Sequence, residues 1–199
     1  MPDMYHEGHR TLQRQHDTER LAEGLRKRAE GQSERIGESE RAFIEARDMF
    51  FLATADAEGR PQCSYKGGDP GFVRVVDAQT VAFPNYDGNG MYLSMGNTLV
   101  NPNVGMLFID FEGQSRLRLN GVASIDPHDP LLAHYPEAQF VVRVAMREMF
   151  ANCPRYIHKY QLVERSTFVP RTGCETPIPD WKLTLFTPET LPANDPARG

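Results

Sequence analysis

Short apolar stretches, each bounded by turn residues, fill the chain between residues 50 and 150. The strand candidates are FFLATAD, QCSYKGG, FVRVV and TVAFPN, followed by VGMLFIDF, SRLRLNGVASI and FVVRVAMREMF. Gly, Pro, Asp and Asn separate them, and these residues favour turns. One helical pattern, at 91–101, is inserted. We expect a mainly β fold, a β-barrel with flanking helices, in which six or so antiparallel strands form the barrel.

Two helical patterns precede the strands. Residues 10–36 are strongly charged and carry only a thin apolar stripe, with Leu21 and Leu25 one turn apart. This stripe predicts a helical arm that lies on the body or on a partner. The segment ESERAFIEARDMF predicts a second, better-packed helix, with Ser39 as its cap. The expected organisation is an arm at 1–37, a barrel domain at 38–165 and a C-terminal extension at 166–199.

Composition and charge narrow the function. The chain has 199 residues, 40% hydrophobic and 25% charged, which is enough for one domain with a real core. A net charge of −5 argues against a broad grip on nucleic acid or on an anionic membrane. The first ten residues lack the apolar core of a signal peptide, and no window approaches eighteen apolar residues, so we expect a cytoplasmic protein.

The cysteines and histidines do not suggest a metal site. Cys63, Cys153 and Cys174 are odd in number and widely spaced, so we expect neither a disulfide framework nor structural zinc, but three buried small side chains. The six histidines have no ligand-like spacing. No Ser-His-Asp arrangement or carboxylate pair stands out either, so the catalytic groups are left unassigned.

The stretch GNGMYLSMGNTLVNP is the first candidate site. A Gly-rich loop leads into a helix with Ser94 and Asn97 near its start, and the helix ends at Asn101 because Pro102 follows. Unpaired amides, the helix dipole and a hydroxyl can hold a phosphate without many lysines. The alternative is that Ser94 and Asn97 only cap the helix and hold the loop.

Two strands supply further candidates. In SYKGGDPGF, Ser64 and Lys66 lie on one face of a strand, and Gly67 leaves a backbone amide approachable by a ligand. The alternative is an exposed strand-end lysine beside a bulge. In RLRLNG, Arg116 and Arg118 alternate with leucines, so they form a cationic face, which in isolation is solvated.

Taken together these motifs resemble a family. The order F-x-L-A-T-A-D-x-x-G-R-P, S-Y-K-G-G-D-P-G-F-V, F-P-N-Y-D-G-N, S-M-G-N, N-P-x-V-G-M-L-F and L-R-L-N-G is similar to that of the FMN-binding split-barrel proteins related to pyridoxamine 5′-phosphate oxidase. The resemblance covers about residues 40–165. It implies a six-stranded antiparallel split barrel, bound FMN and a homodimer with two sites at its interface.

The resemblance also implies residue roles. Around the FMN phosphate it places Ser64, Lys66, Gly67, Ser94 and Asn97, and at the edge of the flavin ring Phe83, Pro84 and Asn85. Arg116 and Arg118 are the candidates for the positive charge near the reduced flavin, in a site that two subunits share. Trp181, the only tryptophan, is either a cover for the flavin or a hydrophobic anchor for the tail.

Departures from the family pattern limit the activity. The Arg-Pro-Arg-x-Ser run with which the true oxidases hold their substrate phosphate has no counterpart in DPHDPLLAHYPEAQF, so vitamin B6 oxidation is not expected. In the segment REMFANCPRYIHKY, Pro154 suits a first helical position. Arg155, Tyr156 and His158 then either face substrate or belong to a capped helix on the barrel.

Three hypotheses follow. The leading one is an FMN-dependent oxidoreductase that acts on a small substrate and is reduced by a nicotinamide nucleotide or a partner protein. The second is a carrier or sensor that binds flavin, deazaflavin or haem without turnover. The third is a split-barrel scaffold that has lost its ligand and acts through its surface and arm.

Overall fold

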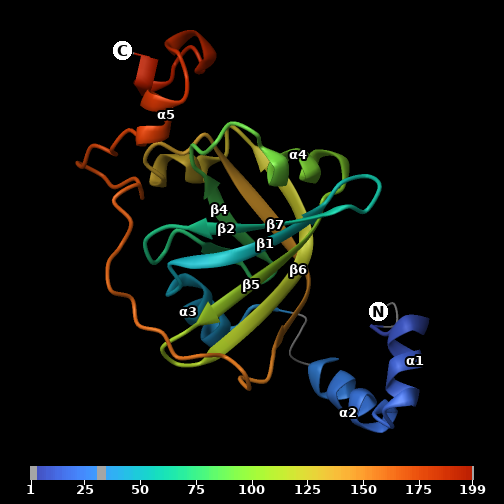
Figure 1. Cartoon of the computed structure of the whole chain (residues 1–199). Coiled ribbons are helices and arrows are strands. Elements are labelled where there is room, and N and C mark those ends of the chain that lie inside the picture. Colours follow the sequence, from blue (N-terminus) through green and yellow to red (C-terminus); the bar gives the residue numbers. More distant parts are fainter. Residues whose placement is uncertain (1–3, 31–34, 199) are drawn as a thin grey trace.

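Seven antiparallel strands form the body of the protein in the computed structural model, which describes residues 4–30 and 35–198 (Figure 1). The strands are β1 (Met49–Ala55), β2 (Pro61–Gly67), β3 (Arg74–Asp77), β4 (Thr80–Asn85), β5 (Asn103–Asp110), β6 (Ser115–Asp126) and β7 (Phe140–Ala151). Their order in the sheet is β2-β1-β5-β6-β7-β4-β3. The expected mainly β fold is confirmed. The expected count of six is wrong, because all seven stretches singled out as strand candidates join the sheet, including FVRVV, which forms the four-residue β3.

The core lies inside the coiled sheet, where alternate residues of each strand meet. Phe50 on β1 is fully buried and lies at the centre of an aromatic cluster. Its ring centroid is 5.9 Å from that of Phe72, 5.0 Å from that of Phe83 and 5.3 Å from that of Phe108. Such ring pairs stabilise a core beyond the area that they bury. The strands are therefore held together by apolar packing as well as by their ladder.

A register shift in β6 explains the glycine of the RLRLNG motif. The shift falls between Asn120 and Gly121, where β6 pairs with β7. A Cβ atom at Gly121 would lie 2.4 Å from the carbonyl oxygen of Ala145, so only glycine allows the two backbones to come this close.

The N-terminal arm consists of two helices, α1 (Glu7–Gln15) and α2 (Glu19–Glu30), which stand away from the barrel in Figure 1. The single helix expected over 10–36 is therefore wrong. Asp17 has a φ of 51°, a left-handed conformation that ends the first helix. Residues 31–34 of the expected helix lie outside the described residues. Ile36 belongs to the barrel core, since it is buried and its amide donates to the carbonyl of Ala78.

Helix α3 (Glu38–Glu45) packs beside β3. Gly37 is its N-cap rather than the expected Ser39, and the carboxylate of Glu40 accepts a hydrogen bond from the Gly37 amide at 3.2 Å. Ile44 buries the apolar side of the helix. At the other end, Glu45 accepts a hydrogen bond from the amide of Val75, which ties the helix to the edge strand.

Helix α4 (Leu93–Val100) lies over one end of the barrel and corresponds to the helix expected at 91–101. It ends at Asn101, before Pro102, as expected. A short 3-10 helix, η1 (Pro130–His134), precedes β7.

The chain after β7 runs along the outside of the barrel without strand or helix until α5 (Asp180–Thr184) (Figure 1). The helix expected from Pro154 is absent. Tyr156 has a φ of 73° and is 92% exposed, so the chain makes only a turn there. Two single-turn 3-10 helices, η2 (Pro188–Thr190) and η3 (Pro196–Arg198), follow α5.

The three cysteines are free and exposed, so the expectation that they are buried is wrong. Cys63 lies on the edge strand β2, and its neighbour Ser64 turns to the other side of the strand. Cys153 and Cys174 lie in the irregular segment after β7, which has no core to bury them in. Among the residues that the structure describes, no helix is long and apolar enough to cross a membrane.

Candidate functional site

A cavity of about 590 Å³ opens between the ends of β2 and β4. The barrel side is formed by the stretch 66–69, at the end of β2 and just after it, and by the stretch 84–88, at the end of β4 and just after it. The outer side is formed by the irregular segment, through Leu162, Glu164, Arg165, Ser166, Phe168 and Val169. The two sides of the cavity therefore come from stretches that are far apart in the chain, since Leu162 is 74 residues after Gly88.

Lys66 is the cation that the barrel offers to this cavity. It alternates with the exposed Tyr65 and lies opposite the buried Phe50 in the ladder, so it faces inward from β2. Burial lowers the pKa of its ammonium group. Within residues 4–30 and 35–198, Lys66 has neither a hydrogen-bond partner nor an ion-pair partner. A partly buried, uncompensated cation is a ready site for an anion.

Ser64 and Ser94 come together beside Lys66. The hydroxyl of Ser94, in the first turn of α4, donates to the hydroxyl of Ser64 at 2.9 Å. The residue before the helix, Tyr92, is left-handed and gives no side-chain cap to the first helical amides. The start of α4 therefore presents backbone N–H groups that no capping side chain satisfies. Of the alternative role, the capping part is wrong for Ser94, whereas its side chain does hold the helix to the strands.

Asn97 joins α4 to the barrel. Its amide nitrogen donates to the hydroxyl of Thr54 on β1 at 3.2 Å, and Thr54 is buried. One helical turn separates Asn97 from Ser94, so the two side chains attach the same side of the helix to β1 and β2. This pair of contacts fixes the height of the helix start above the strands.

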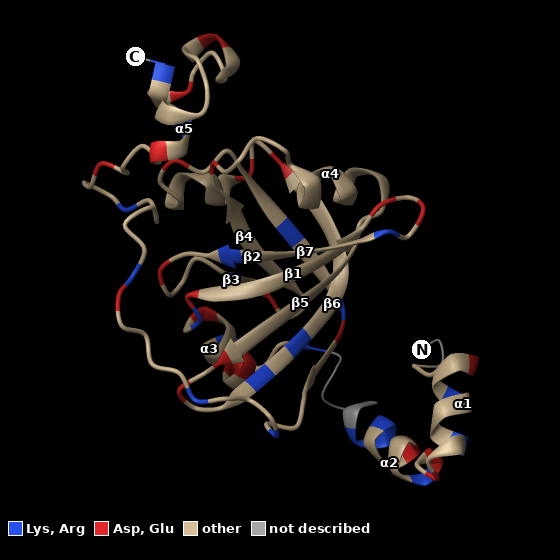
Figure 2. Cartoon of the chain, in the orientation of Figure 1, with Lys and Arg blue, Asp and Glu red and all other residues tan. Residues whose placement is uncertain are grey.

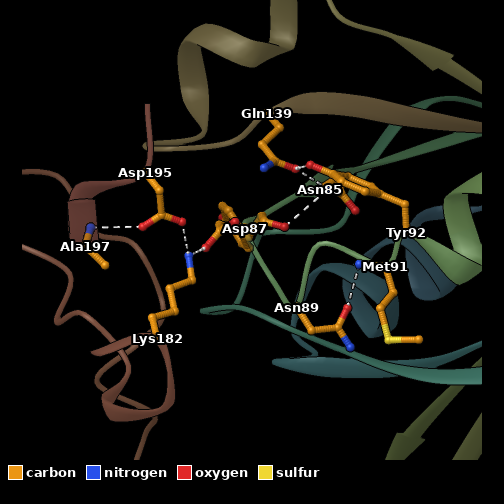
Figure 3. Close-up of polar contacts among 10 residues, drawn as sticks. Asn85, Asp87, Asn89, Met91, Tyr92, Gln139, Lys182, Asp195 and Ala197 are labelled. Carbon is orange, nitrogen blue, oxygen red and sulfur yellow. Dashed lines mark hydrogen bonds and ion pairs between the residues drawn. The ribbon is translucent and has the colours of Figure 1, made fainter. Parts of the chain in front are cut away.

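The loop after β4 is fixed by an amide network (Figure 3). The side-chain oxygen of Gln139 accepts hydrogen bonds from the Asn85 amide and from the Tyr92 hydroxyl, both at 2.9 Å. Asn89 accepts from the amide of Met91 at 3.0 Å. The loop that leads into α4 is thus held against the start of β7, and it keeps its shape beside the cavity.

Acidic side chains on the rim of the cavity meet cations from the C-terminal segment. Arg171 donates to both carboxylate oxygens of Asp69, at 2.6 and 2.9 Å, and Arg165 donates to the same carboxylate at 3.4 Å. These contacts, the Arg171 hydrogen bond first, hold the pKa of Asp69 below its usual range. On the opposite rim, the ammonium of Lys182 lies 2.5 Å from Asp87 and 2.6 Å from Asp195 (Figure 3).

The structure places two of the expected phosphate residues and two of the expected ring-edge residues in the cavity lining, and the others outside it. Lys66, Gly67, Pro84 and Asn85 line the cavity. The remaining expected residues do not line it. Ser64 and Ser94 pair next to it, and Asn97 is bound to Thr54. Phe83 lies in the core, Arg116 and Arg118 lie on β6, and Trp181 of α5 packs on Phe186, which follows that helix.

Some contributing residues carry no local sequence signal. Gln139 and Thr54 are ordinary in their sequence context and become part of the site only through folding. Asp69 and Asp87 stand in the motifs that the sequence singled out, but their partners lie 102 and 95 residues later. Figure 2 shows blue bands on β2, β6 and β7 within otherwise mostly tan strands, and many of the acidic residues in loops and turns.

The family model for pyridoxamine 5′-phosphate oxidase matches residues 36–167. The chain belongs to this family. The match spans all seven strands, α3 and α4, and confirms the resemblance carried by the S-Y-K-G-G and F-P-N-Y-D-G-N motifs. The arm helices and α5 lie outside it.

Solved structures with a similar fold have varied descriptions. A putative pyridoxamine 5′-phosphate oxidase from Lactobacillus delbrueckii is 22% identical, with a TM-score of 0.48, and the match covers 59% of this chain and 94% of that one. The heme storage protein HutZ from Vibrio cholerae is 23% identical, with a TM-score of 0.42 and coverage of 58% and 94%. An FMN-binding protein from Syntrophomonas wolfei is 10% identical, with a TM-score of 0.46 and coverage of 67% and 94%. No curated protein matches the sequence.

Proposed function

We propose that this member of the pyridoxamine 5′-phosphate oxidase family is an FMN-binding flavoprotein and an FMN-dependent oxidoreductase for a small substrate. The observation that carries the proposal is the unpaired, partly buried ammonium of Lys66, close to the Ser64–Ser94 pair. The FMN phosphate is an anion, and it would compensate this cation. The cavity volume of about 590 Å³ also falls within the range of about 300–1,000 Å³ that is usual for small-molecule sites.

The roles of the cavity residues follow from their chemistry. Lys66, the hydroxyls of Ser64 and Ser94 and the first amides of α4 would hold the phosphate. Pro84 and Asn85, at the end of β4, would meet the edge of the flavin ring. A bound flavin supplies transfer of hydride or of single electrons, whereas the protein orients it and tunes its charge. The electrons would come from a nicotinamide nucleotide or a partner protein. Pyridoxamine phosphate is not the proposed substrate.

The proposal includes a homodimer. The side chains that support it lie on and before α4: Met91, Tyr92, Leu93, Leu99 and Val100 are large, apolar and exposed. A clustered apolar surface of this kind is typical of a protein interface. Arg116 and Arg118 do not line this chain's own cavity, so a role near flavin requires a second subunit. Sedimentation of the protein would distinguish a dimer from a single chain.

Absorption spectroscopy tests the cofactor. We expect flavin absorption bands from the protein after addition of FMN, with one FMN per chain, and FMN as the mass of the released chromophore. A haem spectrum, a deazaflavin or a colourless protein that ignores FMN would contradict the proposal.

A matched variant tests the placement of the phosphate. Lys66→Met should weaken FMN binding about ten- to hundredfold, because a hydrogen bond to a charged group in a partly buried site is lost. Lys27→Met on α2 removes a lysine from the arm and should leave binding unchanged. Equal FMN affinities of these two variants would contradict the role of Lys66.

A further inference from the structure

The chain between Leu162 and Lys182, which we call the clasp, crosses the mouth of the cavity from one rim to the other. At one rim, Arg171 binds Asp69, which follows β2. At the other rim, Lys182 binds Asp87, which follows β4. Both aspartates line the cavity, and Leu162 and Phe168 of the clasp form part of its outer side. The clasp therefore covers the cavity and is attached to the barrel at two rims.

The fastening at the first rim is a charge-assisted fork. The Nε and Nη2 atoms of Arg171 donate to different oxygens of Asp69, at 2.6 and 2.9 Å, and Arg165 adds a third, longer hydrogen bond at 3.4 Å. Two parallel N–H donors fix the direction of the side chain as well as its distance. Asp69 and Arg171 are both about one-third exposed, so water and salt reach the pair.

The attachment at the second rim is partly buried, since Lys182 and Asp195 are buried but the side chain of Asp87 is 56% exposed. Lys182 is only 5% exposed, and its ammonium is shared by Asp87 from the barrel loop and Asp195 from the end of the chain (Figure 3). Breaking such a group by removing one partner leaves a buried charge uncompensated. The buried pair here, Lys182 with Asp195, lies within the C-terminal segment, and the contact with Asp87 is what links it to the barrel.

Between the two anchors the clasp is attached through side chains, such as the Thr176 hydroxyl, which donates to the carboxylate of Glu137 at 2.9 Å. Over 162–182, the described residues make no backbone hydrogen bond to the barrel; the last one, from Tyr160 to Phe111, comes just before. Val163 is 97% exposed, and Phe168 and Leu162 are half exposed. A segment with few buried apolar contacts and no ladder opens at a low free energy compared with the strands. We propose that the clasp opens and closes the cavity, and that Arg171 and Lys182 control the exchange of its ligand.

The choice of FMN as that ligand rests on the proposed function above, but opening of the clasp does not. A cover that must open for every passage makes both entry and exit proportional to the open fraction. Loosening the clasp therefore speeds association and dissociation together. Loss of a ligand contact would instead raise dissociation alone. Arg171 and Lys182 suit this test because neither of them lines the cavity.

The test uses the full-length protein with Arg171→Gln, Lys182→Met, the double variant, and Arg60→Gln as control. Arg60 forms an exposed ion pair with Asp56 at the turn between β1 and β2, outside the cavity lining. The first readout is trypsin cleavage after Arg165 in protein without ligand. The second is the rates of FMN binding and release, followed by fluorescence.

We expect Arg171→Gln to accelerate cleavage at Arg165 and both FMN rates by about three- to tenfold, and the double variant to accelerate them more. Arg171→Lys keeps the charge but loses the fork, so its rates should be intermediate. Rates equal to those of Arg60→Gln in both readouts would overturn the proposal, as would faster cleavage with unchanged FMN rates. If the wild-type protein fails to bind FMN, the proposed function fails, and the cleavage rates alone decide whether the clasp opens.

Discussion

The barrel wall of the cavity and its outer wall, the clasp, are held in place by different forces. Lys66 and Asn85 come from strands that are paired over their whole length and packed on a buried aromatic cluster. The clasp has no ladder and few buried side chains, and a few ion pairs attach it. One wall thus depends on apolar burial, which responds little to pH and salt, whereas the other depends on charges, which respond to both. The same cavity combines a rigid side with an adjustable one.

The largest expected effect breaks both walls at once. Phe50→Ala removes the ring at the centre of the aromatic cluster and should lower the free energy of unfolding by about 3–5 kcal/mol. Urea unfolding followed by far-UV circular dichroism measures this. Leu185→Ala, just after α5 at a position that is 71% exposed, is the control and should stay within about 0.5 kcal/mol of the wild type. A loss below about 1 kcal/mol for Phe50→Ala would contradict the account of the barrel wall.

A smaller effect separates the two walls by pH. Hydrogen bonds from Arg171 and Lys182 lower the pKa of Asp69 and of Asp195, respectively. Their stabilisation is present above the unfolded pKa of about 3.9 and is lost as the pH falls through the lower folded pKa. The attachment of Arg171 to Asp69 should therefore persist at about pH 5 and be lost below about pH 4, together with the pair of Lys182 and Asp195 inside the C-terminal segment.

The single tryptophan makes that detachment visible. Trp181 lies in α5, and its ring contacts Lys182 and Phe186 of the same segment, so its emission reports on the C-terminal segment. On acidification the emission should change before the circular dichroism of the strands is lost. Coinciding transitions would mean that both walls form one cooperative unit.

The smallest effect concerns the contact between α4 and β2. Ser64→Ala removes the acceptor of the Ser94 hydroxyl and should cost about 0.5–1.5 kcal/mol of stability. Thermal unfolding measures it as a shift of a few degrees, with the emission of Trp181 unaffected at low temperature. Ser39→Ala on α3 is the matched control and should have no effect, because Gly37 is the cap there. Equal shifts of the two variants would show that the serine pair contributes nothing.

The barrel wall was largely predictable from the sequence because its signals are local. Alternation of apolar and polar residues marks each strand, and the same alternation put Ser64 and Lys66 on one face. Pro102 correctly predicted the end of α4. The wrong predictions have local causes too: a left-handed Asp17 divides the arm, and Tyr156 turns the chain where Pro154 suggested a helix. Propensity gives no warning of a single residue with positive φ.

The outer wall could not be predicted, because its determinants are pairs of charges about a hundred residues apart. No sequence signal near Asp69 predicts Arg171 as its partner, and none near Asp87 predicts Lys182. In the sequence these residues look like ordinary solvated charges, which is what most such residues are. The exposure of the cysteines was missed for a related reason. Two of the three lie in this outer segment, whose position on the barrel is set by such distant contacts and not by a local apolar pattern.

The order of the strands in the sheet has a consequence for how the molecule assembles. The hairpins β1–β2 and β3–β4 are neighbours along the chain, yet β2 and β3 form opposite edges of the sheet. Each hairpin can form locally, but their docking sites, β5 for one and β7 for the other, belong to the meander that is made after both. Pairing β1 with β5, and β4 with β7, closes long stretches of intervening chain, and such closures are slow. Residues 68–73 join β2 to β3, so the rim that carries Asp69 takes its final shape only when both of these edge strands have docked. During synthesis the chain therefore completes its scaffold before its site.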